Sequence, residues 1–335
     1  MIDLVGYGAF FLTIALSYAI IALGLNVQWG QTGLFNVGVA GFVAIGAYVS
    51  GLLTTPDATG RIGGFGLPIL VGWLAAILAG ALLAYAVGWL TIRLRADYLA
   101  ITTFGFAVTV QLAALNLESL TGGPFGMSFI PRPFASAAGD PVRFGLLNLG
   151  LVALVLLVAY FVVEHLTASP WGRVLRAIRE DEPAAVSLGK SAARFRLQAF
   201  AVGGALMALG GAVQAHFIGF IAPDNYLPLL TFQVWTMLIV GGSGNNRGAI
   251  AGSVVVWALW AVSASVIGQV MPAGEQARGA SLQIVLIGVA LCVILLLRPR
   301  GLIGERRTVS RHVAGARRGE RSGTMVATGR ETPTP

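Results

Sequence analysis

The chain has 335 residues, of which 56% are hydrophobic and 11% are charged, and its formal net charge is +8. Its mean hydropathy is +0.80, whereas a water-soluble domain carries about 25% charged residues to cover its surface. This composition excludes a soluble enzyme, a secreted disulfide scaffold and a disordered regulator. The single cysteine, Cys292, lies in an apolar run and offers neither a disulfide partner nor a metal cluster. The sequence therefore predicts an integral membrane protein.

About nine hydrophobic segments follow one another along the chain, and a bilayer-spanning helix needs roughly 20 mostly apolar residues. The segments are Leu4–Gly24, Val37–Leu53, Leu67–Leu90, Tyr98–Leu117, Gly145–Val163, Leu197–Phe220, Leu229–Val240, Ala249–Ile267 and Leu282–Leu297. They predict an all-α, polytopic membrane helix bundle. Leu229–Val240 is short and is interpreted either as a crossing or as a re-entrant segment. The first segment lacks a basic n-region, so we expect it to remain in the mature chain rather than to be cleaved as a signal peptide.

Lysine and arginine are unevenly distributed between the connecting segments. If the C-terminus is cytoplasmic, 18 of the 22 basic residues lie on the inner side, and the four outside are Arg61, Arg132, Arg143 and Arg278. Because cytoplasmic loops are enriched in Lys and Arg, this bias predicts a cytoplasmic C-terminus. With nine crossings, the N-terminus lies outside. If Leu229–Val240 is re-entrant and does not cross, the N-terminus lies on the cytoplasmic side instead.

The last part of the chain differs in composition from the rest. Residues 298–335 hold nine basic and three acidic side chains, and from about Gly304 the sequence is rich in Arg, Gly, Ser, Thr and Pro without apolar periodicity. We therefore expect a transmembrane domain at 1–303 and a disordered cytoplasmic tail at 304–335. The charge of the tail is typical of topological anchoring and attraction to anionic lipid rather than of nucleic-acid binding.

Small residues recur at every fourth position in two places. The first stripe is Gly72, Ala76, Gly80, Ala84 and Gly88, and the second is Gly244, Gly248 and Gly252. Such stripes let neighbouring helix backbones approach closely. They serve either packing inside the bundle or a subunit interface, and the first is the commoner use.

Two polar, glycine-rich breaks interrupt the apolar pattern, at residues 26–36 and 241–248. Irregular backbone at membrane depth is tolerated only where it is buried in protein or lines a wet cavity. Paired broken segments are a pointer to a translocation pathway in transporters. Either break alone is equally well interpreted as a plain cytoplasmic loop, and the two together favour a pathway.

The chain lacks the chemistry of an enzyme or of an ion-coupled carrier. The sequence contains no complete Gly-x-x-x-x-Gly-Lys-Ser/Thr phosphate loop, and its histidines have no metal-ligand spacing. Ion-coupled carriers keep carboxylates inside the membrane, whereas Asp97, Glu118 and Glu164 lie at segment ends. We therefore expect no enzymatic activity and no cofactor, and an energy source supplied by another protein.

The loop at about 168–196 has the pattern of a docking element. Val174, Leu175 and Ile178 fall on one helical face, with arginines on the other sides. A second short helix is predicted at Ala184–Leu188, opened by Pro183 and ended by a glycine. The alternative is a helix that lies on the membrane, but a short helix of mixed charge binds lipid poorly. A surface for a soluble partner is favoured.

These residues carry a resemblance to a known family. The stretch from Ser169-Pro170-Trp171-Gly172-Arg173 to Gly189, with Ala184-Ala185-x-x-x-Gly189 at its core, resembles the cytoplasmic coupling loop of ABC importer permeases for branched-chain amino acids. The resemblance covers about residues 15–303 and is closest to the LivM-type subunit. Further matches are Gly24-Leu25-Asn26-Val27-Gln28-Trp29-Gly30, Thr32-Gly33-Leu34-Phe35-Asn36, Asp97-Tyr98-Leu99-Ala100-Ile101, Thr121-Gly122-Gly123-Pro124 and Val240-Gly241-Gly242-Ser243-Gly244. One departure is Pro183, where the wider importer pattern has Glu; here Glu182 lies one position earlier.

The resemblance implies a heteromeric importer in a bacterial inner membrane. This chain would pair with a sister permease, bind two cytoplasmic ATPase subunits and receive substrate from a periplasmic binding protein. The family carries leucine, isoleucine and valine, and sometimes other neutral amino acids, amides or urea; a sugar permease of a related importer stays an alternative. The resemblance assigns coupling to residues of the loop: Arg173, Arg176, Arg179, Glu182, Ala184, Ala185 and Gly189.

Polar side chains in or beside apolar segments are candidates to line a pathway for a zwitterion. They are Asn26, Gln28, Thr32, Asn36, Thr102, Thr103, Gln111, Gln214 and Gln233. For each of them the alternative is an interhelical hydrogen bond, which stabilises a membrane protein by about 0.6 kcal/mol.

Two other functions remain open at this point. A stand-alone secondary transporter or channel for small neutral solutes could use the same breaks, but the missing intramembrane carboxylates and the structured loop disfavour it. A non-transporting scaffold would leave both breaks unexplained.

Overall fold

The computed structural model describes residues 4–57, 62–270, 276–298 and 301–305. The chain divides into two compact units, Met1–Gly304 and Glu305–Pro335, and the helices that the structure describes belong to the first. Its long elements are α1 Leu4–Leu25, the π-helix η1 Asn26–Gly30, α2 Val39–Thr54, α3 Ile69–Thr91, α4 Ala96–Asn116, α6 Pro141–Ala168, α7 Pro170–Glu180, α9 Ala192–Ile218, α10 Pro228–Gly241, α11 Asn246–Val270 and α12 Gln276–Leu297. The short elements are α5 Glu118–Thr121, η2 Gly123–Phe125, η3 Ala135–Ala137, α8 Glu182–Ser187 and η4 Pro223–Tyr226.

The helices confirm the predicted all-α membrane bundle. Six of them, α1, α3, α4, α6, α9 and α11, are long and apolar enough to cross a membrane, and three shorter apolar helices accompany them. Each predicted segment corresponds to one helix. The short segment is α10, whose 14 residues extend about 21 Å, which is less than the roughly 30 Å of a hydrocarbon core. The fifth segment is longer than expected, because Asp140 caps α6 and starts the helix at Pro141.

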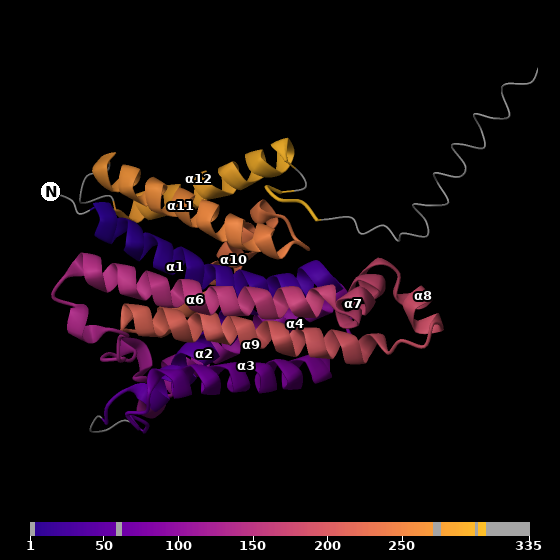
Figure 1. Ribbon diagram of the computed structural model, residues 1–335, viewed down its shortest axis with the longest axis horizontal. Helices are drawn as coiled ribbons and strands as arrows, with labels where there is room; N and C mark the ends of the chain where they lie inside the picture. Colours follow the sequence, from indigo (N-terminus) through magenta and orange to yellow (C-terminus); the bar gives the residue numbers. More distant parts are fainter. Residues whose placement is uncertain (1–3, 58–61, 271–275, 299–300, 306–335) are drawn as a thin grey trace, which may run out of the picture. The chain divides into compact units, whose positions relative to one another are not determined.

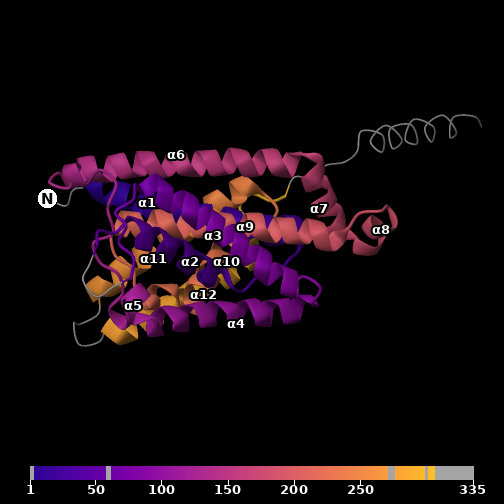
Figure 2. The ribbon, with the colours of Figure 1, turned by 90° about the horizontal axis from the view of Figure 1, so that it is seen from below.

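Helices α1 and α9 form the centre of this unit (Figures 1 and 2). The most apolar windows of α1 and α9 are 72% and 67% buried, against at most 28% for the other four long helices. In Figure 2, α6 and α4 lie on opposite sides of the unit, with α1, α2 and α9 between them. The outer helices expose large apolar side chains, for example Leu78 and Leu82 on α3 and Ile101 on α4, as expected of surfaces that face lipid or another subunit.

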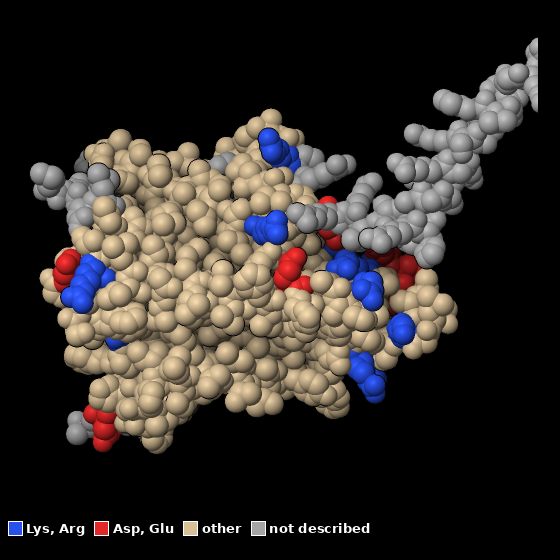
Figure 3. Space-filling model, in the orientation of Figure 1, with Lys and Arg blue, Asp and Glu red and all other residues tan. Residues whose placement is uncertain are grey.

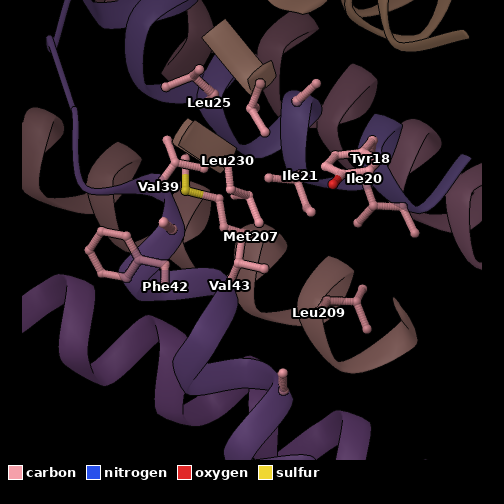
Figure 4. Packing of buried hydrophobic residues seen from close by; sticks show 14 of the residues in the cluster. Tyr18, Ile20, Ile21, Leu25, Val39, Phe42, Val43, Met207, Leu209 and Leu230 are labelled. Carbon is pink, nitrogen blue, oxygen red and sulfur yellow. The ribbon is translucent and has the colours of Figure 1, made fainter. Parts of the chain in front are cut away.

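The core lies where α1, α2, α9 and α10 meet (Figure 4). Ile21, Phe42 and Met207 are fully buried there. Lipid tails are as apolar as these side chains, so the association of the helices depends on close van der Waals packing.

The two stripes of small residues lie inside the bundle. A Cβ on Gly80 would overlap Ala208 and lie 2.8 Å from the carbonyl oxygen of Gly204, both on α9. In the second stripe, a Cβ on Gly248 would lie 2.7 Å from the carbonyl oxygen of Gly241 on α10. Both stripes therefore face helices of the same chain.

Candidate functional site

The first break continues α1 as a π-helix and then leaves the helical path. η1 covers Asn26–Gly30, and residues 33–38 have no regular structure. Buried polar side chains of the break bind one another and a neighbouring helix. The Gln28 amide donates to the carbonyl oxygen of Phe200 on α9 at 2.8 Å, and the Asn36 amide donates to Gln28 Oε1 at 2.7 Å. Backbone groups of the break are paired too: the N–H of Gly38 donates to Asn36 Oδ1 at 2.7 Å, and the N–H of Leu34 donates to the carbonyl oxygen of Gln28 at 3.0 Å. Irregular backbone at membrane depth requires such partners within the protein.

The second break, at residues 242–245 between α10 and α11, lies against the first. Asn26 is the link: its amide nitrogen donates to Asn246 Oδ1 at 2.9 Å, and its Oδ1 accepts from the backbone N–H of Gly244 at 2.8 Å. The Gln31 amide donates to the carbonyl oxygen of Gly244 at 3.0 Å. A Cβ on Gly30 would lie 2.5 Å from the nitrogen of Gly244. The two polar breaks therefore form one buried region.

The loop after α6 folds into two short helices whose starts are capped by side chains. Ser169 accepts from the N–H of Trp171 at 3.2 Å at the start of α7, and Asp181 accepts from the N–H of Ala184 at 3.0 Å at the start of α8. This cap begins the second helix at Glu182 rather than at the expected Ala184, and the helix ends at Ser187 instead of Leu188. Gly189 follows with a φ of +77°, a conformation that favours glycine.

The apolar face of α7 packs on the bundle as its pattern predicts. Leu175 packs with Val27 of the first break and with Ala199 of α9. Ile178 packs with Ala185 of α8 and Ala192 of α9. Helix α7 is therefore fixed against the first break and the start of α9.

Two arginines of α7 bind the first break directly. Arg176 Nη1 donates to Gln31 Oε1 and to the carbonyl oxygen of Thr167, both at 3.1 Å. Arg179 Nη1 donates to the carbonyl oxygen of Gly30. These arginines therefore lie between the loop and the bundle, whereas Arg173 is exposed.

The rest of the loop presents a surface to its surroundings. Val186 and Leu188 are 51% and 79% exposed, while an ion pair at 2.9 Å between Glu182 and Arg196 ties α8 to α9. On the face drawn in Figure 3, Lys and Arg gather toward the end of the bundle that carries α7 and α8, and the band between the two ends is mainly uncharged. A fixed surface with exposed apolar side chains and arginines can bind another protein.

Comparison with known proteins decides the family. A family model described as the permease component of branched-chain amino acid transport systems matches residues 8–295. The chain belongs to this family. It is 33% identical to the high-affinity branched-chain amino acid transport system permease protein LivM of Escherichia coli K12, over 92% of this chain and 73% of that protein. No solved structure gives a significant match.

Two further relatives carry similar names. The probable branched-chain amino acid transport permease protein LivM of Methanocaldococcus jannaschii is 29% identical, over 88% of this chain and 92% of that protein. The high-affinity branched-chain amino acid transport system permease protein LivH of Escherichia coli K12 is 24% identical, over 88% of this chain and 93% of that protein. The relatives are transport permeases, and this chain is a multi-pass membrane protein of their kind.

The expected pathway residues of this permease fall into separate groups. Asn26, Gln28, Thr32 and Asn36 are fully or almost fully buried at the first break. Thr103 is also buried and accepts from the N–H of Val37 at 3.0 Å.

The remaining four expected pathway residues lie away from the breaks. The hydroxyl of Thr102 donates to the carbonyl oxygen of Tyr98 in its own helix, and Gln111 is half-buried on α4. Gln214 lines a cavity between α1, α9 and α10, and Gln233 lines a smaller one, of about 150 Å³, between α10, α11 and α12. Five of the nine candidates thus lie at the first break, with Thr103 bonded to its end, and two others line separate cavities.

Sequence reasoning missed the residues that connect this buried region to α6. The amide of Asn246 donates to Glu164 Oε2 at 2.8 Å and lies 3.3 Å from the hydroxyl of Thr167. Asn246 lies inside the second polar break of the sequence, so its position could have identified it as a candidate residue. Glu164 was interpreted only as an interfacial carboxylate at a helix end. The sequence of one helix does not indicate which residue of another helix its side chain will contact.

Proposed function

We propose that this chain is the permease subunit of an ATP-binding-cassette importer that carries branched-chain or other neutral amino acids across the bacterial inner membrane. The observation that carries the proposal is the contact of α7 with the first break through Arg176 and Arg179. A cytoplasmic partner that moves α7 would move Gly30 and Gln31 with it, and through them the second break. Membership of the permease family supports the same function.

The energy comes from two separate ATPase subunits that dock on the loop of α7 and α8. The exposed Val186, Leu188 and Arg173 form the docking surface, and the chain supplies no complete phosphate loop of its own. Glu182, Ala184, Ala185 and Gly189 shape that surface. The loop is cytoplasmic in this arrangement, and so are the C-terminus and the basic tail at 304–335, which follows a membrane domain at 1–303.

A sister permease and a periplasmic binding protein complete the importer. The two relatives from Escherichia coli K12, LivM and LivH, both bear the name of a high-affinity branched-chain amino acid transport system permease protein, which supports two different permease chains in one system. The apolar outer faces of α3, α4 and α6 are available to lipid and to such a sister chain.

The proposal is tested by purifying the tagged chain from its native membrane in mild detergent and identifying co-eluting proteins by mass spectrometry. We expect a second hydrophobic permease together with one or two ATPases that contain phosphate loops. The complex, reconstituted in liposomes with its binding protein, should take up leucine only when ATP is supplied. A chain that elutes alone and mediates solute flux without ATP would overturn the proposal and favour a secondary carrier.

A further inference from the structure

A cavity of about 340 Å³ lies between α1, α9 and α10, at the end of the bundle away from α7 and α8. Its position follows from α9, whose 27 residues run about 40 Å from Ala192, near α8, to Ile218 in the cavity wall. Small-molecule sites have volumes of about 300 to 1,000 Å³, so this cavity is of the size that suits a small ligand.

The lining combines uncharged polar groups with an apolar wall. Tyr18, Gln214, Asn225 and Tyr226 supply hydroxyl and amide groups, and Ile218 is one of the apolar members. Tyr18 and Gln214, on α1 and α9, both line the cavity. Among the described residues that line the cavity, none is charged.

The inner end of the cavity is closed by the core. Figure 4 shows Tyr18 at the edge of that core, with Ile21 and Leu230 farther in. Ile21 and Leu25, which follow Tyr18 along α1, are fully buried. The cavity is therefore separated from the breaks by packed side chains.

The wall formed by residues 218–221 is held from behind by the loop that follows α5. Met127 and Ile221 form a β-bridge, with the N–H of Met127 donating to the carbonyl oxygen of Ile221 at 2.8 Å. The N–H of Ile130 donates to the carbonyl oxygen of Gly219 at 3.2 Å. The Arg132 guanidinium donates to the carbonyl oxygen of Ile218. A wall fixed by these contacts keeps its lining side chains in place.

A further polar group lies beside the cavity without a partner. The ring of Tyr48 on α2 lies 5.8 Å from the ring of Tyr226. Its buried hydroxyl has no hydrogen-bond partner among the described residues. An unpaired buried hydroxyl costs about 1–3 kcal/mol, and such groups are often found where a ligand or water completes the site.

We propose that this cavity is a transit site within the permease for a neutral α-amino acid with an aliphatic side chain. The inference rests on the proposed function and adds the place where this subunit holds the substrate. Uncharged donors and acceptors suit the paired charges of a zwitterion, and Ile218 and Leu230 contact its side chain. Because no fixed charge binds either end of the zwitterion, the ligand leaves easily, as transport requires.

The first test is photo-cross-linking of the complete importer with a diazirine analogue of leucine. We expect the label in peptides that contain Tyr18 or residues 214–230, and we expect excess leucine, but not excess aspartate, to remove it. Labelling confined to the two breaks, or to other parts of the complex, would overturn the cavity assignment.

The second test compares maximal ATP-dependent uptake at saturating binding protein. Gln214→Leu removes hydrogen bonds and should lower leucine uptake about tenfold, whereas Asn116→Leu, an amide on the exposed face of α4, should have no effect. Ala215→Phe fills the cavity and should reduce leucine uptake more than alanine uptake, because less volume remains. The control for added bulk is Ala113→Phe on the surface of α4.

The outcomes separate the two proposals. A wild-type complex that takes up no neutral amino acid overturns the proposed function, and with it the ligand of the cavity. A wild-type complex that takes up leucine, with Gln214→Leu equal to its control and no label at the cavity, overturns the transit site alone. Equal loss of leucine and alanine uptake in Ala215→Phe also contradicts it, because a folding defect does not discriminate by substrate size.

Discussion

The side-chain amide of Asn26 donates a hydrogen bond of 2.9 Å to Asn246, 220 residues away in the sequence. Asn246 in turn donates to Glu164 on α6, and Asn26 accepts from the backbone of Gly244. One pair of asparagines thus joins both polar breaks and connects them to α6. Because Asn26 and Asn246 are buried, each depends on the other for its hydrogen bonds.

The pair should therefore be energetically coupled. In a double-mutant cycle of Asn26→Ala and Asn246→Ala, the free energy of unfolding should change non-additively. We expect a coupling between about 0.6 kcal/mol, the average for interhelical hydrogen bonds in membranes, and about 1.7 kcal/mol, the largest such value. Reversible unfolding of the purified permease in mixed micelles measures it. The control cycle combines Asn26→Ala with Thr109→Ala, on the exposed face of α4. The changes in unfolding free energy of these two variants should be additive. Additivity of the Asn26 and Asn246 changes within about 0.3 kcal/mol would contradict the coupling.

Charge reversal on α7 should uncouple ATP hydrolysis from transport. Arg176→Glu and Arg179→Glu remove the donors to Gln31 and Gly30, and charged hydrogen bonds of this kind contribute about 1.5–3 kcal/mol. We expect ATP hydrolysis to persist in the reconstituted complex while leucine uptake falls at least about tenfold. Arg143→Glu, an exposed arginine at the start of α6, is the control. Normal coupled transport in both α7 variants would remove the role assigned to the two arginines.

Gly189 offers a test of the geometry after α8. Its φ of +77° disfavours a residue with a Cβ by about 1–2 kcal/mol, although the space around it is open. Gly189→Leu should therefore displace the end of α8 and lower the ratio of leucine transported to ATP hydrolysed. Gly189→Asn, which tolerates this conformation better, should retain most of that ratio. Equal behaviour of the two variants would indicate that the backbone conformation does not matter for coupling.

The loop behind the cavity wall gives a further prediction. Gly126 has a φ of +70°, and a Cβ there would overlap the carbonyl oxygen of Ile221. Gly126→Val should thus break the bridge between Met127 and Ile221 and reduce uptake severalfold, with normal amounts of the permease in the membrane. Gly139→Val has open space around it and should behave as the wild type. Uptake and immunoblots of membrane fractions distinguish the two, and wild-type uptake by Gly126→Val would refute the bracing role.

The sequence predicts the helices well because each is a local pattern. Apolar length located every segment of the bundle, and the amphipathic face of α7 was visible in a few residues around Leu175. The polar breaks were also visible, since runs of Asn, Gln and Gly stand out between apolar stretches.

What the sequence could not predict is the pairing between segments that lie far apart. Nothing near Asn26 in the sequence indicates that its side chain binds Asn246. Lining a pathway, or bonding to another helix, was an equally open interpretation. The arginines of α7 were expected away from its apolar face, but the side chains of Arg176 and Arg179 are long enough to reach the first break. Gln214 was selected only as a polar residue in an apolar segment, and its neighbour Asn225 was missed, because a cavity is formed by three helices together.

The contact between Asn26 and Asn246 also orders events during synthesis of the chain. A ribosome adds about 5–20 residues per second, so the 220 residues that separate the two asparagines require about 10 to 45 s. During that time α1 is already made, while the polar groups of the first break lack their final partners. Asn26 therefore lacks its final partner until α11 has been made, and slower translation between the two breaks prolongs that interval.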